Sequence, residues 1–138
     1  MNAKEFLKQY KKWDKLIENK LIEIRRWREV AENTTTSMDG DRVQSSQNPN
    51  KIADAIGKYI DLEREIREDI EKLIDAKKDV VGVIERLEAT EYDVLHKMYI
   101  QGLSFWEIAE KYDRTYSWAT TVHGQAVKHV QDILNERG

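Results

Sequence analysis

Apolar residues recur every three or four positions along most of the chain, which is the spacing of one helix face. The first such run extends from Asn2 to about Asn33, and Asn2 with Glu5 forms a capping pair at its start. The run predicts a helix whose apolar stripe, including two tryptophans, belongs to a hydrophobic core. The stripe consists of Phe6, Tyr10, Trp13, Ile17, Leu21, Ile24, Trp27 and Ala31.

A second, longer stripe begins after Asn48-Pro49, where an asparagine cap is followed by proline at the first helical position. It is maintained for about five heptads and predicts a long helix. The other faces of this helix alternate acidic and basic residues three or four apart, a pattern typical of a solvated surface. The stripe consists of Ile52, Ile56, Tyr59, Leu62, Ile66, Ile70, Leu73, Val80, Ile84 and Leu87, interrupted by Lys77.

The segment from Thr34 to Asn48 lacks this periodicity and is rich in Thr, Ser, Asp, Gly and Gln, which predicts an exposed loop. Two long helices joined by such a loop predict a coiled-coil-like antiparallel hairpin over residues 1–89. Each stripe is wide enough to bury against a second copy as well, so a homodimer through the hairpin is a further expectation.

Residues 90–138 predict three shorter helices. Thr90 followed by Asp93 resembles a capping box for the first, which ends at Gly102. Ser104 with Glu107 predicts the start of the second. The third is expected to run from Tyr116 to about Asn135, with Thr115 as its cap. The inward residues are expected to be Tyr92, Leu95, Met98 and Tyr99 on the first helix, Ile108 and Ala109 on the second, and Ala119, Val122, Ala126, Val130 and Ile133 on the third.

A short helix, a tight turn and a longer helix predict a helix-turn-helix domain, in which the longer helix enters the major groove of DNA. The inward stripe of that helix leaves Tyr116, Ser117, Thr120 and Thr121 facing outward near its start. Hydroxyl groups can bond to bases or phosphates, and a threonine methyl or tyrosine ring can pack on a thymine methyl. These four residues are therefore the candidate base readers.

The same residues carry a family resemblance. Gly102-Leu103-Ser104, followed by Glu107-Ile108-Ala109, Thr115, Val122 and Ala126, resembles region 4 of the sigma-70 family over residues 90–135. Nearly the full length of the chain, including the start MNAKEFL, the run IDLEREI and Trp118 with VHGQAVKHV, resembles small phage and prophage sigma-like late-transcription regulators.

The resemblance implies an activator of late phage genes that binds promoter DNA in the cytoplasm of a bacterial host, with RNA polymerase as a candidate second partner. It places base reading on Tyr116, Ser117, Thr120 and Thr121, and phosphate contacts on Arg114 and Lys128. The chain departs from the family pattern in charge, because no residue from Thr115 to Val127 is basic. Residues 91–138 contain five basic and seven acidic residues.

Since cationic side chains normally supply most non-specific affinity for DNA, this domain alone is expected to bind weakly. A second copy or polymerase would have to add affinity, or the domain serves mainly as a protein-binding surface. Two other functions therefore stay open: the DNA-recognition small subunit of a phage packaging machine, and an adaptor that binds polymerase or a sigma factor.

Composition narrows the remaining choices. The sequence has no cysteine, which excludes disulfides and thiolate chemistry, and it lacks both a long apolar run and a signal-peptide start. His96, His123 and His129 do not share one helical face, so we expect no metal site. No catalytic motif is present, so we expect no cofactor and no enzymatic activity. Glycines inside helices, Gly57, Gly82 and Gly124, are expected at sites of close packing.

Overall fold

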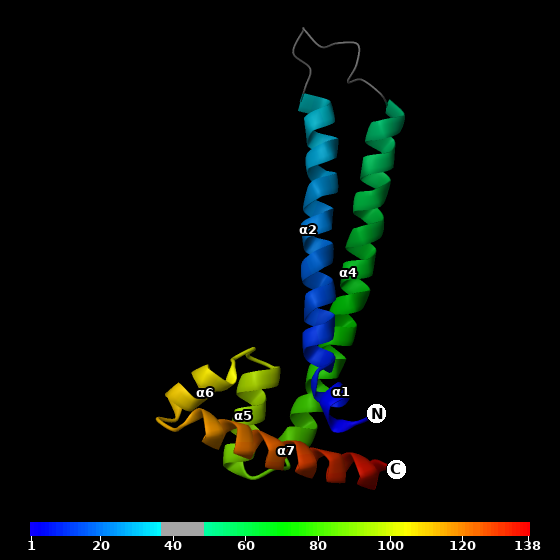
Figure 1. The fold of residues 1–138 in the computed structure, drawn as a ribbon. Helices are drawn as coiled ribbons and strands as arrows, with labels where there is room; N and C mark the ends of the chain where they lie inside the picture. Colours follow the sequence, from blue (N-terminus) through cyan, green and yellow to red (C-terminus); the bar gives the residue numbers. More distant parts are fainter. Residues whose placement is uncertain (37–48) are drawn as a thin grey trace. The chain divides into compact units, whose positions relative to one another are not determined.

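The computed structural model describes residues 1–36 and 49–138, and every regular element in these two ranges is a helix (Figure 1). This confirms the predicted all-α class for the described residues. In the same ranges, no helix combines the length and the apolar character needed to cross a membrane. The elements are α1 (Ala3–Leu7), α2 (Gln9–Thr36), α4 (Pro49–Ile84), α5 (Ala89–Tyr99), α6 (Phe105–Lys111) and α7 (Tyr116–Arg137).

The first predicted helix is divided at Lys8 and continues to Thr36, beyond its expected end at Asn33. The division is slight, because Lys8 keeps a right-handed backbone and its N–H donates to the carbonyl of Lys4 at 3.1 Å. Residues 37–48 lie outside the described residues. They include most of the predicted loop and the predicted cap Asn48. Pro49 is the first residue of α4, as predicted.

Of the four predicted caps that lie in the described residues, three are confirmed. The backbone N–H of Glu5 donates to the Asn2 side chain at 2.9 Å, and that of Trp118 to Thr115 Oγ1 at 3.0 Å. Ser104 makes a reciprocal capping box with its partner three residues on. The capping box predicted at Thr90 is wrong, because α5 begins at Ala89 with Glu88 as its N-cap, and the carboxylate of Glu88 accepts the N–H of Thr90 at 3.0 Å.

Contacts group the described chain into two compact units. One consists of Met1–Asp14 with Lys72–Gly138, and the other of Lys15–Glu71. The first unit therefore combines the start of the chain with α5, α6, α7 and the last turns of α4. The boundary predicted between residues 89 and 90 falls inside this unit.

The first unit contains two hydrophobic clusters that share α5 and α7. One cluster joins α1 and the end of α4 to those helices through Ala3, Phe6, Leu7, Val80, Val83, Ile84, Leu95, Tyr99, Ala126, Val130 and Ile133. The other joins α6 to them through Val94, Ile108, Ala109 and Ala119. The predicted inward residues of α6 and α7 are buried, apart from Val122, which is half-buried.

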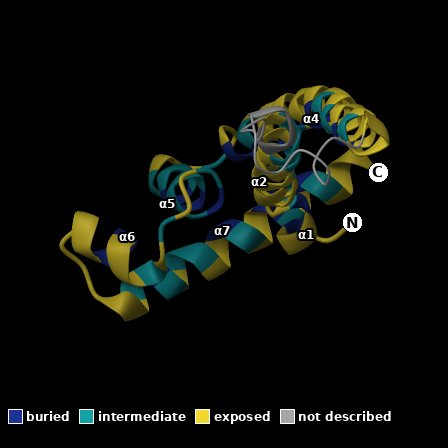
Figure 2. Ribbon diagram, turned by 90° about the horizontal axis from the view of Figure 1, so that it is seen from above, coloured by how far each residue is buried: buried dark blue, intermediate teal, exposed yellow. Residues whose placement is uncertain are grey.

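In the second unit α2 and α4 lie side by side, and most of their surface is exposed (Figure 2). The buried residues here are Ile17, Ala55, Ile66 and Asp69. The ammonium of Lys20 donates to Asp69 at 2.6 Å and lies 3.3 Å from Glu65, and these contacts raise the pKa of Lys20. A charged bond thus replaces part of an apolar core between the two helices.

The stripes predicted for α2 and α4 are only partly buried. Leu21, Ile56 and Ile70 are 42%, 45% and 40% exposed, although their spacing had placed them in the core. The buried residues of α4 in this unit are Ala55, Ile66 and Asp69, and of these only Ile66 belongs to the predicted stripe. A pattern of large apolar residues could not predict that a small residue and a polar one, Ala55 and Asp69, are buried on α4.

The close packing expected at the helical glycines is absent. A Cβ atom added at Gly57, Gly82 or Gly124 would meet no atom of the described residues within 4 Å. These glycines therefore lie on open helix surfaces, where they weaken the helix by about 1 kcal/mol each without an internal contact in return.

The turn between α6 and α7 is a Schellman motif. The N–H of Asp113 donates to the carbonyl of Glu110 at 3.1 Å, and the N–H of Arg114 to that of Ala109 at 2.9 Å. Asp113 takes φ 53°, in the left-handed region where glycine is the usual residue. Its short polar side chain tolerates this conformation better than most but does not remove the strain.

We expect Asp113→Gly to raise the free energy of unfolding of the full chain by about 1 kcal/mol, because glycine has no Cβ to strain at positive φ. Asp113→Ala, which keeps the Cβ, is the matched control and should give no gain. Urea titration of the three proteins measures the difference, and a Gly variant no more stable than the Ala variant would contradict the strain.

Candidate nucleic-acid interface

All six residues predicted to bind DNA lie on α7 or in the turn before it. The exposed ones are Arg114, Tyr116, Ser117, Thr121 and Lys128, and Thr120 is half-buried. Five of the six are therefore available to a partner. Their exposure follows from the inward stripe of α7, which occupies the opposite side of the helix.

One exposed face of α7 contains Ser117, Thr121, Gly124, Gln125 and Lys128. Apart from the adjacent Gly124 and Gln125, neighbouring members of this set are three or four positions apart, so they share one side of the helix for about 16 Å. Gln125 was not among the predicted residues, although its spacing from Thr121 could have identified it. Gly124 lies in the middle of this face, where the helix backbone is open to close approach.

Thr120 differs from the other predicted residues. Its hydroxyl donates to the backbone carbonyl of Ser117 at 3.0 Å. A threonine that bonds back to its own helix has its donor already occupied. Thr120 therefore shapes the first turn of α7, and Thr121 presents the available hydroxyl.

An exposed aromatic pair flanks the start of α7. The rings of Trp106 and Tyr116 lie 4.5 Å apart, and Trp106 is 69% exposed. Phe105 packs edge-on against Tyr116 with centroids 5.7 Å apart. Trp106 was not predicted as a site residue, yet it follows the Ser104 cap and lies outside the inward spacing of Ile108. A large exposed aromatic beside a polar helix face marks a contact surface.

Arg114 is held beside α7 by stacking. Its guanidinium lies 5.4 Å from the centroid of the Trp118 ring, whose other neighbour is the ring of Tyr112 at 4.9 Å. The cation therefore sits on an aromatic support. This contact fixes a positive charge near the N-terminus of α7.

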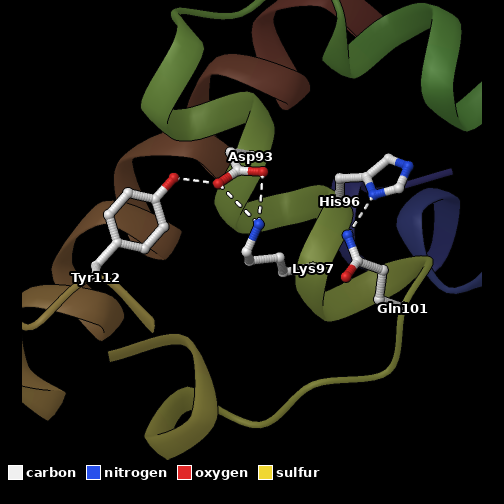
Figure 3. A network of polar contacts seen from close by, with 5 residues as sticks. All are labelled: Asp93, His96, Lys97, Gln101 and Tyr112. Carbon is white, nitrogen blue, oxygen red and sulfur yellow. Dashed lines mark hydrogen bonds and ion pairs between the residues drawn. The ribbon is translucent and has the colours of Figure 1, made fainter. Parts of the chain in front are cut away.

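A half-buried carboxylate links this aromatic support to α5 (Figure 3). Asp93 accepts hydrogen bonds from the hydroxyl of Tyr112 and, at 2.9 and 3.0 Å, from the ammonium of Lys97. Burial by itself would raise the pKa of Asp93, but the two donors outweigh it and lower the pKa. Burial and the bond to Asp93 raise the pKa of Tyr112 to about 12.

The interface holds few available cations. Lys97 is paired with Asp93, and Arg137 is paired with Asp79 at 2.8 Å. In the part of the chain that the structure describes, Lys111, Arg114 and Lys128 make no ion pair. Lys111 is the last residue of α6, Arg114 lies in the turn before α7, and Lys128 lies on the exposed face of α7.

The histidines lie apart from this face or beneath it. The Tyr99 hydroxyl and His123 Nε2 are 2.7 Å apart, His96 Nδ1 lies 2.9 Å from the Gln101 amide, and His129 pairs with Glu91 at 2.8 Å. Across the described ranges, no group of three or more His, Asp or Glu side chains is arranged to hold a metal ion.

Comparison of the chain with protein-family models, curated proteins and solved structures gives no match. The geometry above therefore carries the functional argument.

Tyr112→Phe should lower the free energy of unfolding by about 1 kcal/mol, because it removes a hydrogen bond to the half-buried carboxylate of Asp93. Tyr92→Phe is the matched control, since it removes a tyrosine hydroxyl from α5 without touching that carboxylate. Chemical denaturation gives both values. An equal loss in the two variants would show that the Asp93 bond adds nothing.

Stability should fall as the pH drops from about 7.5 to 5.5. Burial lowers the pKa of His123 in the folded chain, so the unfolded chain, with a pKa near 6.5, binds the proton first. His123→Gln should reduce the slope of unfolding free energy against pH and leave the part due to His96, whose pKa is also lowered by burial. An unchanged slope in the variant would contradict this assignment.

Proposed function

We propose that α6, the turn and α7 act as a helix-turn-helix of the sigma region 4 type, and that the chain is a DNA-binding transcription regulator. The observation that carries the proposal is the exposed face of α7, where Ser117, Thr121 and Gln125 lie in line on a helix braced by α5 and α6. The role is non-enzymatic and belongs to the cytoplasm of a bacterial host.

The chemistry of this face suits the major groove. A glutamine can make two hydrogen bonds to adenine, and hydroxyls accept or donate to several base edges. Gly124 gives the backbone room to approach a base pair or the sugar backbone. A mid-helix glycine without an internal contact is explained if this face meets a partner.

Phosphate contacts fall to the cations around the face. Arg114, on its aromatic support, and Lys128 lie at either end of it, and Lys111 ends α6. The N-terminus of α7 adds backbone N–H groups suited to a phosphate. These contacts would set the register of the helix on the duplex, while the polar face reads the sequence.

Three cations give a weak electrostatic contribution, so the module is expected to act in an assembly. RNA polymerase would add affinity at a promoter, as the resemblance to sigma region 4 and to phage late-transcription regulators implies. The packaging-subunit function would need a ring of many copies instead.

A second candidate function is that of an adaptor binding polymerase or a sigma factor. The exposed Trp106 and Tyr116 favour it, because aromatic side chains are enriched at the centres of protein interfaces. In this case the duplex would not be the main ligand of α7.

Selection of bound duplexes from a random library, using the full chain, tests the first function. We expect one enriched sequence, for which Gln125→Ala should lower affinity by about 1–3 kcal/mol while its affinity for random DNA stays unchanged. Lys128→Ala should weaken binding to both and reduce the slope of log affinity against log salt by about 1.

Lys15→Ala removes a cation from α2 and is the matched control, for which both quantities should remain as in the parent chain. Enrichment of no sequence, together with equal losses for all three variants, would reject base reading by α7. Polymerase binding that depends on Trp106 but not on DNA would then favour the adaptor.

A further inference from the structure

α4 carries a second apolar stripe that lies outside the hydrophobic clusters. Its isoleucines at positions 56, 60, 70 and 74 are 45%, 52%, 40% and 52% exposed. Between them, the same face carries Glu63 and Arg67. Large apolar side chains repeated along one exposed helix face mark an interaction surface.

The spacing of this stripe is that of a helix–helix seam. The four isoleucines together with Glu63 and Arg67 are separated by four, three, four, three and four positions, which is the repeat of a two-stranded coiled coil. α4 is an uninterrupted helix from Pro49 to Ile84, so this spacing alone keeps all six on one face. The seam is about 27 Å long.

The seam is also self-complementary when reversed. Each residue has a mirror partner at the same distance on the other side of position 65, and the mirror partner of an isoleucine is always an isoleucine. The one charged pair has opposite signs. The mirrored pairs are Ile56 with Ile74, Ile60 with Ile70, and Glu63 with Arg67.

We propose that a second copy of this chain docks on the seam in antiparallel orientation and forms a two-fold symmetric dimer. In such an interface each contact occurs twice. Four apolar pairs would flank the centre, and at the centre Glu63 of each copy would face Arg67 of the other. The second copy is thus specified by both the apolar pattern and the charges of the seam.

Charge decides the orientation. In a parallel, in-register pair Glu63 would face Glu63 and Arg67 would face Arg67, which repels at both positions. Within one chain, Arg67 Nη2 lies 2.7 Å from Glu63 Oε1, and the two side chains are 73% and 44% exposed. Both groups are therefore in reach of a partner and can share their bond with it.

Dimerisation through α4 does not depend on DNA binding. It is measured as the molecular mass of the protein in solution, so failure of the dimer and failure of the proposed function are distinguishable. A single helix face is a small interface compared with the roughly 800 Å² per partner of stable complexes, so the dimer should dissociate on dilution.

Charge reversal tests the pairing by analytical ultracentrifugation of the full chain. Glu63→Arg and Arg67→Glu should each weaken self-association at least about tenfold, because each places four like charges at the centre of the seam. An equal mixture of these two variants should associate, and so should the doubly reversed chain. Asp61→Arg, which breaks the exposed Asp61–Arg64 pair off the seam, is the matched control and should leave the dimer intact.

Disulfide trapping tests the orientation, since the parent chain has no cysteine. Ile60→Cys and Ile70→Cys should cross-link to each other when mixed and oxidised, and neither should cross-link efficiently to itself. Self-cross-linking of each variant would indicate a parallel pair and overturn the proposal. A parent chain that stays monomeric at high concentration, a ring of eight or more copies, or no recovery on mixing the reversed variants would also overturn it.

Discussion

The bond between Asp93 and Tyr112 is a polar contact through which the last three helices are linked. The carboxylate belongs to α5, whereas the tyrosine ends α6 and packs on Trp118 of α7. One half-buried charge therefore links α5 to the turn between α6 and α7. Lys97 pairs with the carboxylate from the adjacent turn of α5, and the hydrogen bonds from Lys97 and Tyr112 together lower the pKa of Asp93 although burial raises it.

The consequence is an α7 whose inward side is fixed and whose outward side is left polar. Ser117, Thr121 and Gln125 offer hydrogen bonds without providing charge. Such a face can discriminate between partners but supplies little long-range attraction. For a chain with a net charge of −3, the proposed DNA-reading role of this helix therefore requires that other copies or partners add affinity.

Local signals in the sequence predicted most of the helices and their caps. Ser104, Thr115 and Asn2 were identifiable because a capping residue and its partner lie within one turn. Glu88 was missed as the cap of α5 because Thr90 and Asp93 present a better match to the usual pattern. The inward stripe of α7 predicted which of its residues are exposed, whereas the Asp93 bond joins two helices and has no local pattern in the sequence.

The stripes predicted for α2 and α4 show what apolar periodicity cannot predict, which is the face of a helix that is buried. Ile56 and Ile70 fit a core stripe as well as Ile66 does, but the buried face of α4 is chosen by Ala55 and Asp69, and by the bond from Lys20. A helix with two apolar faces cannot be oriented from its sequence alone. The face left exposed is informative in its own right, since it is the one that suits a second copy.

Backbone amide chemical shifts of the full chain, recorded during titration with a selected duplex, test the central claim most directly. The account predicts that the largest changes occur at Ser117, Thr121, Gly124 and Gln125, with smaller ones at Arg114 and Lys128. Amides of the α4 seam should not change. Changes confined to other surfaces, or a duplex that moves no resonance of α7 at low salt, would contradict a DNA-reading role for this helix.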